Sequence, residues 1–191
     1  MLGIFLDIET NGLDPFEHAA IEIALEIVDV RTGVSLDSFE SIVAISESSW
    51  KKSHSSSLAV NGLSFAEIAK GKSTATIKKN IEELFAHYKV LRGKAVFICQ
   101  NPSFDRPFFR QFFTTAEQEE KGYPYHWLDL ASMFWAISLK EGKYPWELGY
   151  SKDLIAKAYN LPSESKPHRA MNGVHHLLAC YKALVGFPNP I

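Results

Sequence analysis

An apolar stretch near the start of the sequence leads directly into two acidic residues, and this pattern limits both the fold and the function of the chain. Gly3 to Leu6 is typical of a buried strand, and Asp7 and Glu9 follow it two positions apart. Successive side chains on a strand point to opposite faces, so both carboxylates lie on one face. Like charges this close are costly to bury, and a bound Mg²⁺, which takes oxygen ligands, would remove that cost. A solvated acidic pair is the alternative, and the spacing favours neither.

The composition is that of an ordinary globular chain. Its 191 residues are 46% hydrophobic and 22% charged, which predicts a single domain over residues 1–191 with a core of its own. There is no apolar run of about 18 residues and no secretion signal. Cys99 and Cys180 form no metal or redox motif, so we expect reduced thiols and a cytoplasmic location. A net charge of −2 argues against a protein that coats long nucleic acid, but not against a nuclease that grips one strand end.

The pattern of the first half predicts three strands, a loop, a helix and a fourth strand. Alternation predicts a half-buried strand over 21–27, and a turn at 31–33 leads to a strand over 34–45, which together favour an antiparallel meander. The serine-rich segment 46–57 predicts a solvated surface loop. Ser73 is a good cap for a helix with apolar residues as far as Leu91, and the apolar strand 94–99 that follows favours parallel pairing.

The second half predicts one more strand and several helices. Ser103 is expected to cap a helix with Asp105 in its first turn, a position that the helix dipole alone explains. Residues 127–130 predict a short last strand that runs into a helix, and Ser151 predicts a cap for a helix over 152–160. A loop over 162–167 then leads to a last helix from 168 to about 184.

Three separated motifs carry a resemblance to a known family. They are Asp-Ile-Glu-Thr-Asn-Gly-Leu at 7–13, Asn-Pro-Ser-Phe-Asp at 101–105 and His-Arg-Ala at 168–170. In this order the set resembles the histidine branch of the DEDD exonuclease superfamily (DEDDh), which includes the proofreading epsilon subunit of bacterial DNA polymerase III, ribonuclease T and oligoribonuclease. Asn-Gly-Leu at 61–63 also looks like the family's His-Gly-Ile element, with Asn in place of His.

The resemblance implies a fold and a reaction. The fold is α/β and ribonuclease-H-like, with a mixed five-stranded sheet, three antiparallel strands first and then parallel ones, flanked by helices. The reaction is removal of nucleotides from the 3′ end of single-stranded DNA or RNA, by two-metal-ion hydrolysis with Mg²⁺ or Mn²⁺.

The resemblance also assigns roles to individual residues. Asp7 would bridge the two metal ions, Glu9 would hold the first and Asp105 would assist the second. His168 would take the proton of the attacking water, a role that suits a group titrating near neutral pH. The residues expected to hold the terminal nucleotide are Thr10, Leu13, Asn61 and Phe104.

One position departs from the family pattern. A fourth carboxylate is expected five residues after the histidine, where this chain has Gly173, and no Asp or Glu occurs from Lys166 onward. Asn172 lies about 100° away around a helix. His176 lies one turn on, but imidazole is a poorer partner for Mg²⁺ than for transition metals, which favours an ordinary helix position for this residue.

Two functions follow from this departure. The chain is either a working exonuclease, slow or Mn²⁺-dependent, or a degenerate module that binds a nucleic-acid end, a polymerase or another partner without cleaving. Gly173→Asp distinguishes them, because it should raise activity or metal affinity only if the site is one ligand short. The retained carboxylates and histidine favour the enzyme. The resemblance leaves open a homodimer or polymerase association, and the short tail after the last helix favours a free-standing enzyme.

Overall fold

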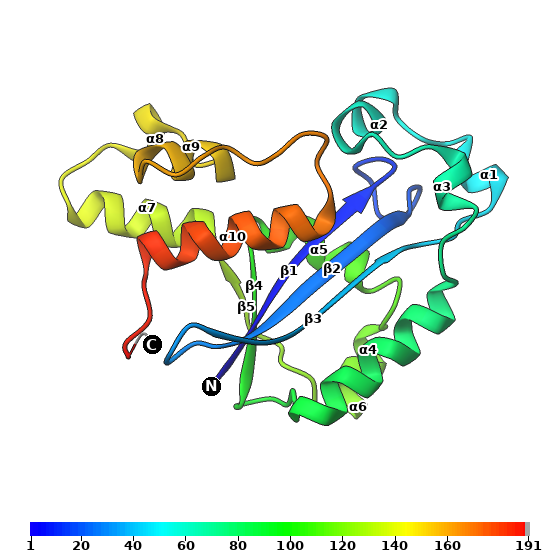
Figure 1. Ribbon diagram of the computed structural model, residues 1–191, viewed down its shortest axis with the longest axis horizontal. Helices are drawn as coiled ribbons and strands as arrows, with labels where there is room; N and C mark the ends of the chain where they lie inside the picture. The colour runs from blue at the N-terminus through cyan, green and yellow to red at the C-terminus, as the bar shows by residue number, and fades with distance from the viewer. Residues whose placement is uncertain (190–191) are drawn as a thin grey trace.

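A five-stranded mixed sheet forms the centre of the molecule (Figure 1). The computed structural model describes residues 1–189, and the strand order in its sheet is β3-β2-β1-β4-β5. The first three strands pair antiparallel, whereas β4 pairs parallel with β1 and β5 pairs parallel with β4. This confirms the predicted fold class. The strands are β1 (Leu2–Thr10), β2 (Ala20–Asp29), β3 (Val34–Ile42), β4 (Ala95–Cys99) and β5 (Trp127–Asp129).

Helices cover both faces of the sheet. None of the helices within residues 1–189 combines the length and the apolar character that crossing a bilayer requires. The helices are α1 (Glu47–Trp50), α2 (Ser55–Asn61), α3 (Phe65–Ile68), α4 (Thr74–Tyr88), α5 (Pro102–Phe109), α6 (Thr115–Glu120), α7 (Leu130–Lys140), α8 (Pro145–Leu148), α9 (Lys152–Ala158) and α10 (Ala170–Leu184).

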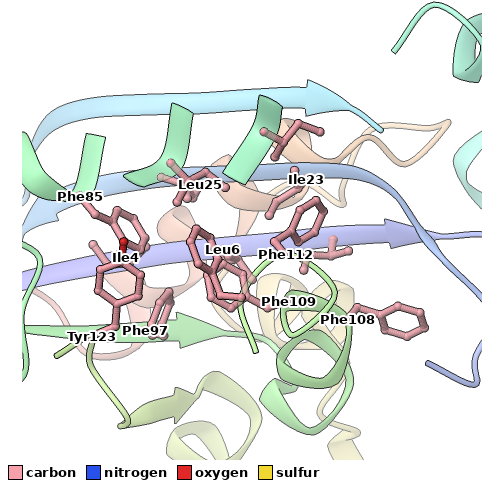
Figure 2. Close-up of a cluster of buried hydrophobic side chains, with 14 of the residues drawn as sticks. Ile4, Leu6, Ile23, Leu25, Phe85, Phe97, Phe108, Phe109, Phe112 and Tyr123 are labelled. Atoms are coloured by element: carbon pink, nitrogen blue, oxygen red, sulfur yellow. The ribbon is translucent and has the colours of Figure 1, made fainter. Parts of the chain in front are cut away.

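The two faces of the sheet carry separate hydrophobic cores. Figure 2 shows the core under α4 and α5, where Ile4 and Leu6 of β1 meet a group of aromatic rings that includes Phe97 and Phe109. On the opposite face, Phe5 packs with buried residues of α7, α9 and α10. Because side chains alternate along a strand, Asp7 lies on the same face as Phe5. The carboxylates at the end of β1 therefore lie on the α10 side of the sheet.

The second strand is buried more completely than its alternating sequence predicts. Every residue from Ala20 to Val28 is buried, including Glu22 and Glu26, so the prediction of a half-buried strand is wrong. The strand lies between β1 and β3, with α10 on one face. On the other face Ile23, Leu25 and Ile27 pack in the core under α4, so both of its faces are covered. The adjacent strand β3 ends at Ile42, three residues before its predicted end.

The segment predicted as a surface loop contains helices. The Ser46 side chain accepts a hydrogen bond from the Ser49 N–H and caps α1, and α2 begins at Ser55. These helices have four and seven residues, too short for a 3.6-residue period to show in the sequence. Trp50 packs against Phe65, with 5.8 Å between ring centroids, so it belongs to a small core cluster.

Several helix boundaries also differ from the predictions, including the end of α9 at Ala158, two residues before its predicted end. The helix α4 begins after Ser73, as predicted, but it ends at Tyr88 because Lys89 adopts a left-handed conformation. Asn101, not Ser103, is the N-cap residue of α5, with Pro102 as the first helical residue, where a missing N–H costs nothing. The last helix begins at Ala170, so the preceding histidine lies just outside it.

Candidate active site

One cavity brings together the four predicted catalytic side chains. It has a volume of about 360 Å³, and its lining includes the end of β1 and the loop that leads into α10. Figure 1 shows the course of these two segments. Four separate segments of the chain contribute to its lining, and none of the sequence motifs shows this alone. The lining includes Asp7 and Glu9 of β1, Phe104 and Asp105 of α5, Ser151, Lys152 and Asp153 around the start of α9, and Glu164 and His168 from the loop before α10.

A backbone hydrogen bond fixes the position of Asp105. Its Oδ1 atom accepts a hydrogen bond from the Ile8 N–H at 3.2 Å, which ties the first turn of α5 to β1. Only 6% of the residue is exposed. Burial, followed by the nearby Asp7 carboxylate, raises the pKa of Asp105 well above its usual range. The residue is therefore placed by more than the helix dipole.

The two strand carboxylates are also poorly solvated. Burial, followed by the nearby Asp7 carboxylate, raises the pKa of Glu9 to about 8. Burial also raises the pKa of Asp7, although the Lys152 ammonium opposes the shift. A cation that neutralised this group of carboxylates would restore their ionised form. The chemistry of these oxygen donors therefore fits a divalent metal ion.

The raised pKa of Glu9 predicts a pH-dependent loss of stability. Above pH 4.5 the unfolded state ionises Glu9, while the metal-free folded state keeps it protonated until about pH 8, so stability falls as pH rises through this window. We expect Glu9→Gln to stabilise the metal-free protein at pH 8 by about 1 kcal/mol or more, and to change little at pH 4.5. Urea unfolding at both pH values measures this. If Glu9→Gln changed the stability equally at both pH values, the raised pKa of Glu9 would be contradicted.

His168 faces the cavity from the loop before α10. Its backbone N–H donates to the Val60 carbonyl of α2 at 3.0 Å, which holds the loop beside the end of β1. The side chain is 28% exposed, and its Nδ1 atom lies 3.5 Å from Glu164 Oε1. The ring is thus accessible to solvent and directed into the same space as the carboxylates.

An ion pair between a half-buried arginine and a buried glutamate fixes the start of α10. The Arg169 guanidinium donates to both oxygens of Glu22, with Nε at 3.1 Å from each and Nη2 at 2.6 Å from Oε1. The Ala170 N–H also donates to Glu22 Oε2, at 2.9 Å. Arg169 makes no side-chain cap of its own, so Glu22 satisfies the first turn of the helix. This contact therefore sets the position of the adjacent His168.

Removal of Glu22 should loosen this arrangement. Glu22→Ala leaves the Arg169 charge without its partner and the Ala170 N–H without an acceptor, and we expect a loss of about 3 kcal/mol in the free energy of unfolding. Asp29→Ala is the control, because it removes an exposed Asp–Arg pair of the same sheet and should change stability little. Urea denaturation compares them, and similar losses would show that Glu22 has no special role.

The residues predicted to hold a nucleotide occupy different environments. Phe104 lines the cavity. Asn61 is 1% exposed, and its amide donates to the Thr10 carbonyl at 3.1 Å, while the Thr10 hydroxyl donates to the Gly12 carbonyl at 2.7 Å. Leu13 is 70% exposed and is not part of the cavity lining. Thr10 and Asn61 thus shape the turn after β1, and their contact with substrate stays a prediction.

Two residues that the sequence reasoning missed lie in the same cavity. The Lys152 ammonium is 3.1 Å from Asp7 Oδ1 and 2.9 Å from Glu164 Oε2, and it donates to the Gly173 carbonyl at 3.3 Å. The side chains of Lys152 and Glu164 are 12% and 2% exposed. Burial alone would raise the pKa of Glu164, but the His176 imidazole and the Lys152 ammonium outweigh it and hold the pKa at about 2.

The helix α10 passes very close to Asp7. A Cβ atom added to Gly173 would lie 2.2 Å from Asp7 Oδ2 and 2.5 Å from its Cγ. Real Cβ atoms do not approach other heavy atoms this closely, so Asp7 in its present position requires glycine at 173. Asp7 thus occupies part of the space that a carboxylate side chain at position 173 would need.

These side chains fit one metal ion better than two. Within residues 1–189, no three His, Cys, Asp or Glu side chains are grouped so that they could hold an ion by themselves. Mg²⁺ is commonly held by one or two carboxylates with waters or substrate phosphates, and Asp7 with Glu9 would supply such a pair. A second ion at Asp7 would compete with Lys152, which already contacts Asp7 Oδ1.

Solved structures similar to this one include nucleases. E. coli exonuclease I in complex with a dT13 oligonucleotide has a TM-score of 0.76 and 18% identity, and the zinc-bound form of its complex with single-stranded DNA has a TM-score of 0.77 and 19% identity. The cell-death related nuclease 4 (CRN-4) has a TM-score of 0.76 and 14% identity over 99% of this chain and 66% of that protein. For the two exonuclease I structures, the match covers 96% of this chain but only 41% and 40% of theirs.

Sequence comparison identifies the family. A search of curated proteins finds no matching relative. The family model RNase_T, described as exonuclease, matches residues 4–181, which include both ends of the cavity lining, from Asp7 to His168. This chain therefore belongs to the RNase_T exonuclease family of the DEDD superfamily.

Proposed function

We propose that this protein is a metal-dependent 3′-to-5′ exonuclease that removes nucleotides from the 3′ end of single-stranded DNA or RNA. The observation that carries the proposal is the meeting of Asp7, Glu9, Asp105 and His168 in one cavity. Burial of three carboxylates together is costly for a fold that makes no use of them. The family membership of the chain supports the same reaction class.

Each side chain has a defined part in this reaction. Asp7 and Glu9 would hold a divalent ion, which polarises the scissile phosphate and lowers the pKa of bound water. Asp105 is oriented toward this pair by the Ile8 N–H. His168 would take the proton from the attacking water, because its ring faces the cavity and remains partly exposed.

The shape of the site suits the end of a single strand. Phe104 lines the cavity next to Asp105 and offers an aromatic face, and stacking on such a face is tolerant of base identity. The exonuclease I structures contain single-stranded oligonucleotides. Because this chain spans about two fifths of those proteins, the strand specificity is our proposal for this chain. Association with a second copy or with a polymerase also stays a prediction.

End-labelled oligonucleotides test the proposal. We expect 5′-labelled single-stranded DNA or RNA to shorten stepwise in Mg²⁺ or Mn²⁺, and the same strand labelled at its 3′ end to release the label as a mononucleotide at once. Asp7→Ala should abolish both, and EDTA should do the same. Loss of the 5′ label first would reverse the polarity. No shortening in either metal would contradict the proposed hydrolysis.

A module that binds strand ends without cleaving them is the second candidate. The Lys152 ammonium beside Asp7 and the glycine at 173 favour it, because both weaken a two-ion site. Fluorescence anisotropy with a labelled oligonucleotide separates the candidates. A strand that binds in Mg²⁺ and is recovered at full length would support the module, whereas a bound strand that shortens supports the enzyme.

A further inference from the structure

We infer that the Lys152 ammonium group takes the place of one divalent cation in this site, and that Glu164 supplies the carboxylate that position 173 lacks. The inference rests on the proposed function for what the site does. The evidence is that one buried lysine lies among oxygen atoms. Membership of the family does not by itself predict this arrangement. The result would be an exonuclease site with one exchangeable metal ion and one cation that the protein itself supplies as a lysine side chain.

The Lys152 ammonium group has one oxygen neighbour for each of its three N–H donors. A lysine has three N–H donors, and Nζ of Lys152 has three oxygen neighbours: Asp7 Oδ1 at 3.1 Å, Glu164 Oε2 at 2.9 Å and the Gly173 carbonyl at 3.3 Å. The three oxygens come from β1, the loop before α10, and α10. A lysine that is 12% exposed and joins three segments is a structural cation, not a solvated side chain.

Both oxygens of Asp7 already have close neighbours. An aspartate that bridges two ions with one oxygen on each needs both oxygens free. Here Oδ1 contacts Lys152, and Oδ2 lies 2.2 Å from the position of a Cβ on residue 173, so it is packed against α10. The lysine and the helix together therefore occupy the surroundings that a second ion at Asp7 would need.

The formal charge of the lining already includes one fixed positive charge. Fully ionised, Asp7, Glu9, Asp105 and Glu164 carry four negative charges. Lys152 neutralises one of them, and its ammonium group contacts both Asp7 and Glu164. The lining therefore needs less divalent charge than the same four carboxylates would need without a buried lysine.

Counting bound Mn²⁺ tests the inference without any need for catalysis. The purified full chain is titrated with Mn²⁺, and free Mn²⁺ is measured by electron paramagnetic resonance. We expect one bound ion per wild-type chain and two per Lys152→Met chain. Lys78→Met is the matched control, because it removes a partly buried lysine that pairs with Glu117 outside the cavity, and it should bind one ion.

Each outcome has a defined meaning. Two ions bound by the wild-type chain would overturn the inference, and so would a count that Lys152→Met leaves unchanged. If Lys152→Met does not fold, the number of ions bound by Lys152→Gln is compared with the number bound by the wild type instead. If the wild type binds no ion and the variant gains one, the lysine does replace a cation, and the proposed metal-dependent activity of the wild type fails instead.

Discussion

Replacing Lys152 with methionine is expected to destabilise the metal-free protein by about 3 to 5 kcal/mol. Methionine keeps much of the length and volume of the lysine stem but removes its charge. Glu164, of which 2% of the side chain is exposed, and Asp7 would then be left buried without a cationic partner. Urea denaturation in EDTA measures the loss, and saturating Mg²⁺ should recover most of it, because the ion can then neutralise the same oxygens.

Two comparisons show whether the loss comes from the unpaired carboxylates. Lys152→Met combined with Glu164→Gln should be more stable than Lys152→Met alone, since the second change removes one of the uncompensated charges. Lys78→Met should cost much less, because its ion pair with Glu117 is more exposed. If the two lysine variants were equally stable, Lys152 would be an ordinary surface residue and the account of the site would be wrong.

Replacing Gly173 with alanine is expected to destabilise the protein by about 1 to 3 kcal/mol, although alanine favours helices. In an unobstructed helix interior, the change from glycine to alanine would stabilise by about 0.5 to 1 kcal/mol. Here the new Cβ would lie 2.2 Å from Asp7 Oδ2. The carboxylate cannot turn away freely, because Lys152 holds its other oxygen. Thermal and urea unfolding of the single variant would measure the effect.

A double-mutant cycle isolates the contact that causes this effect. In the Asp7→Ala background the obstructing carboxylate is absent, so Gly173→Ala should now stabilise the protein by about 0.5 to 1 kcal/mol. The sign of the substitution therefore reverses between the two backgrounds. A loss of the same size in both would mean that something other than Asp7 excludes a side chain at 173.

The same contact changes what Gly173→Asp should do. From the sequence alone, restoring a carboxylate could raise activity or metal affinity if the site were one ligand short. In the folded protein the aspartate would meet Asp7 before it reached a metal ion. We therefore expect no gain from Gly173→Asp unless Lys152 is also replaced, so that Asp7 is free to move.

Much of the frame of the site could be predicted from the sequence. The i, i+2 spacing of Asp7 and Glu9 placed both on one face of β1, and the crossover pattern predicted that β4 pairs parallel, although not that its partner is β1. The Ser73 and Ser151 caps located the starts of α4 and α9. These features depend on residues close in sequence, where period and capping are informative.

Neither periodicity nor capping in the sequence indicates the burial of Lys152 and Glu164, the two buried residues that were missed in the site. Lys152 is the first residue of a short helix and Glu164 belongs to a polar loop, where charged side chains are usually solvated. Their burial arises only because α9, the loop and α10 close over the end of β1. Short helices such as α1 were missed for a related reason, since one turn shows no periodicity.

The dependence of cleavage on metal concentration shows whether Lys152 replaces one of two ions. Single-turnover cleavage of a 5′-labelled single strand by the wild-type chain would be measured across a range of Mn²⁺ concentrations. We predict stepwise shortening from the 3′ end, with a rate that rises with the first power of Mn²⁺ and then saturates. A rate that rises with the square of Mn²⁺ would contradict the role of Lys152 as the second cation, and no shortening at any concentration would contradict the enzyme itself.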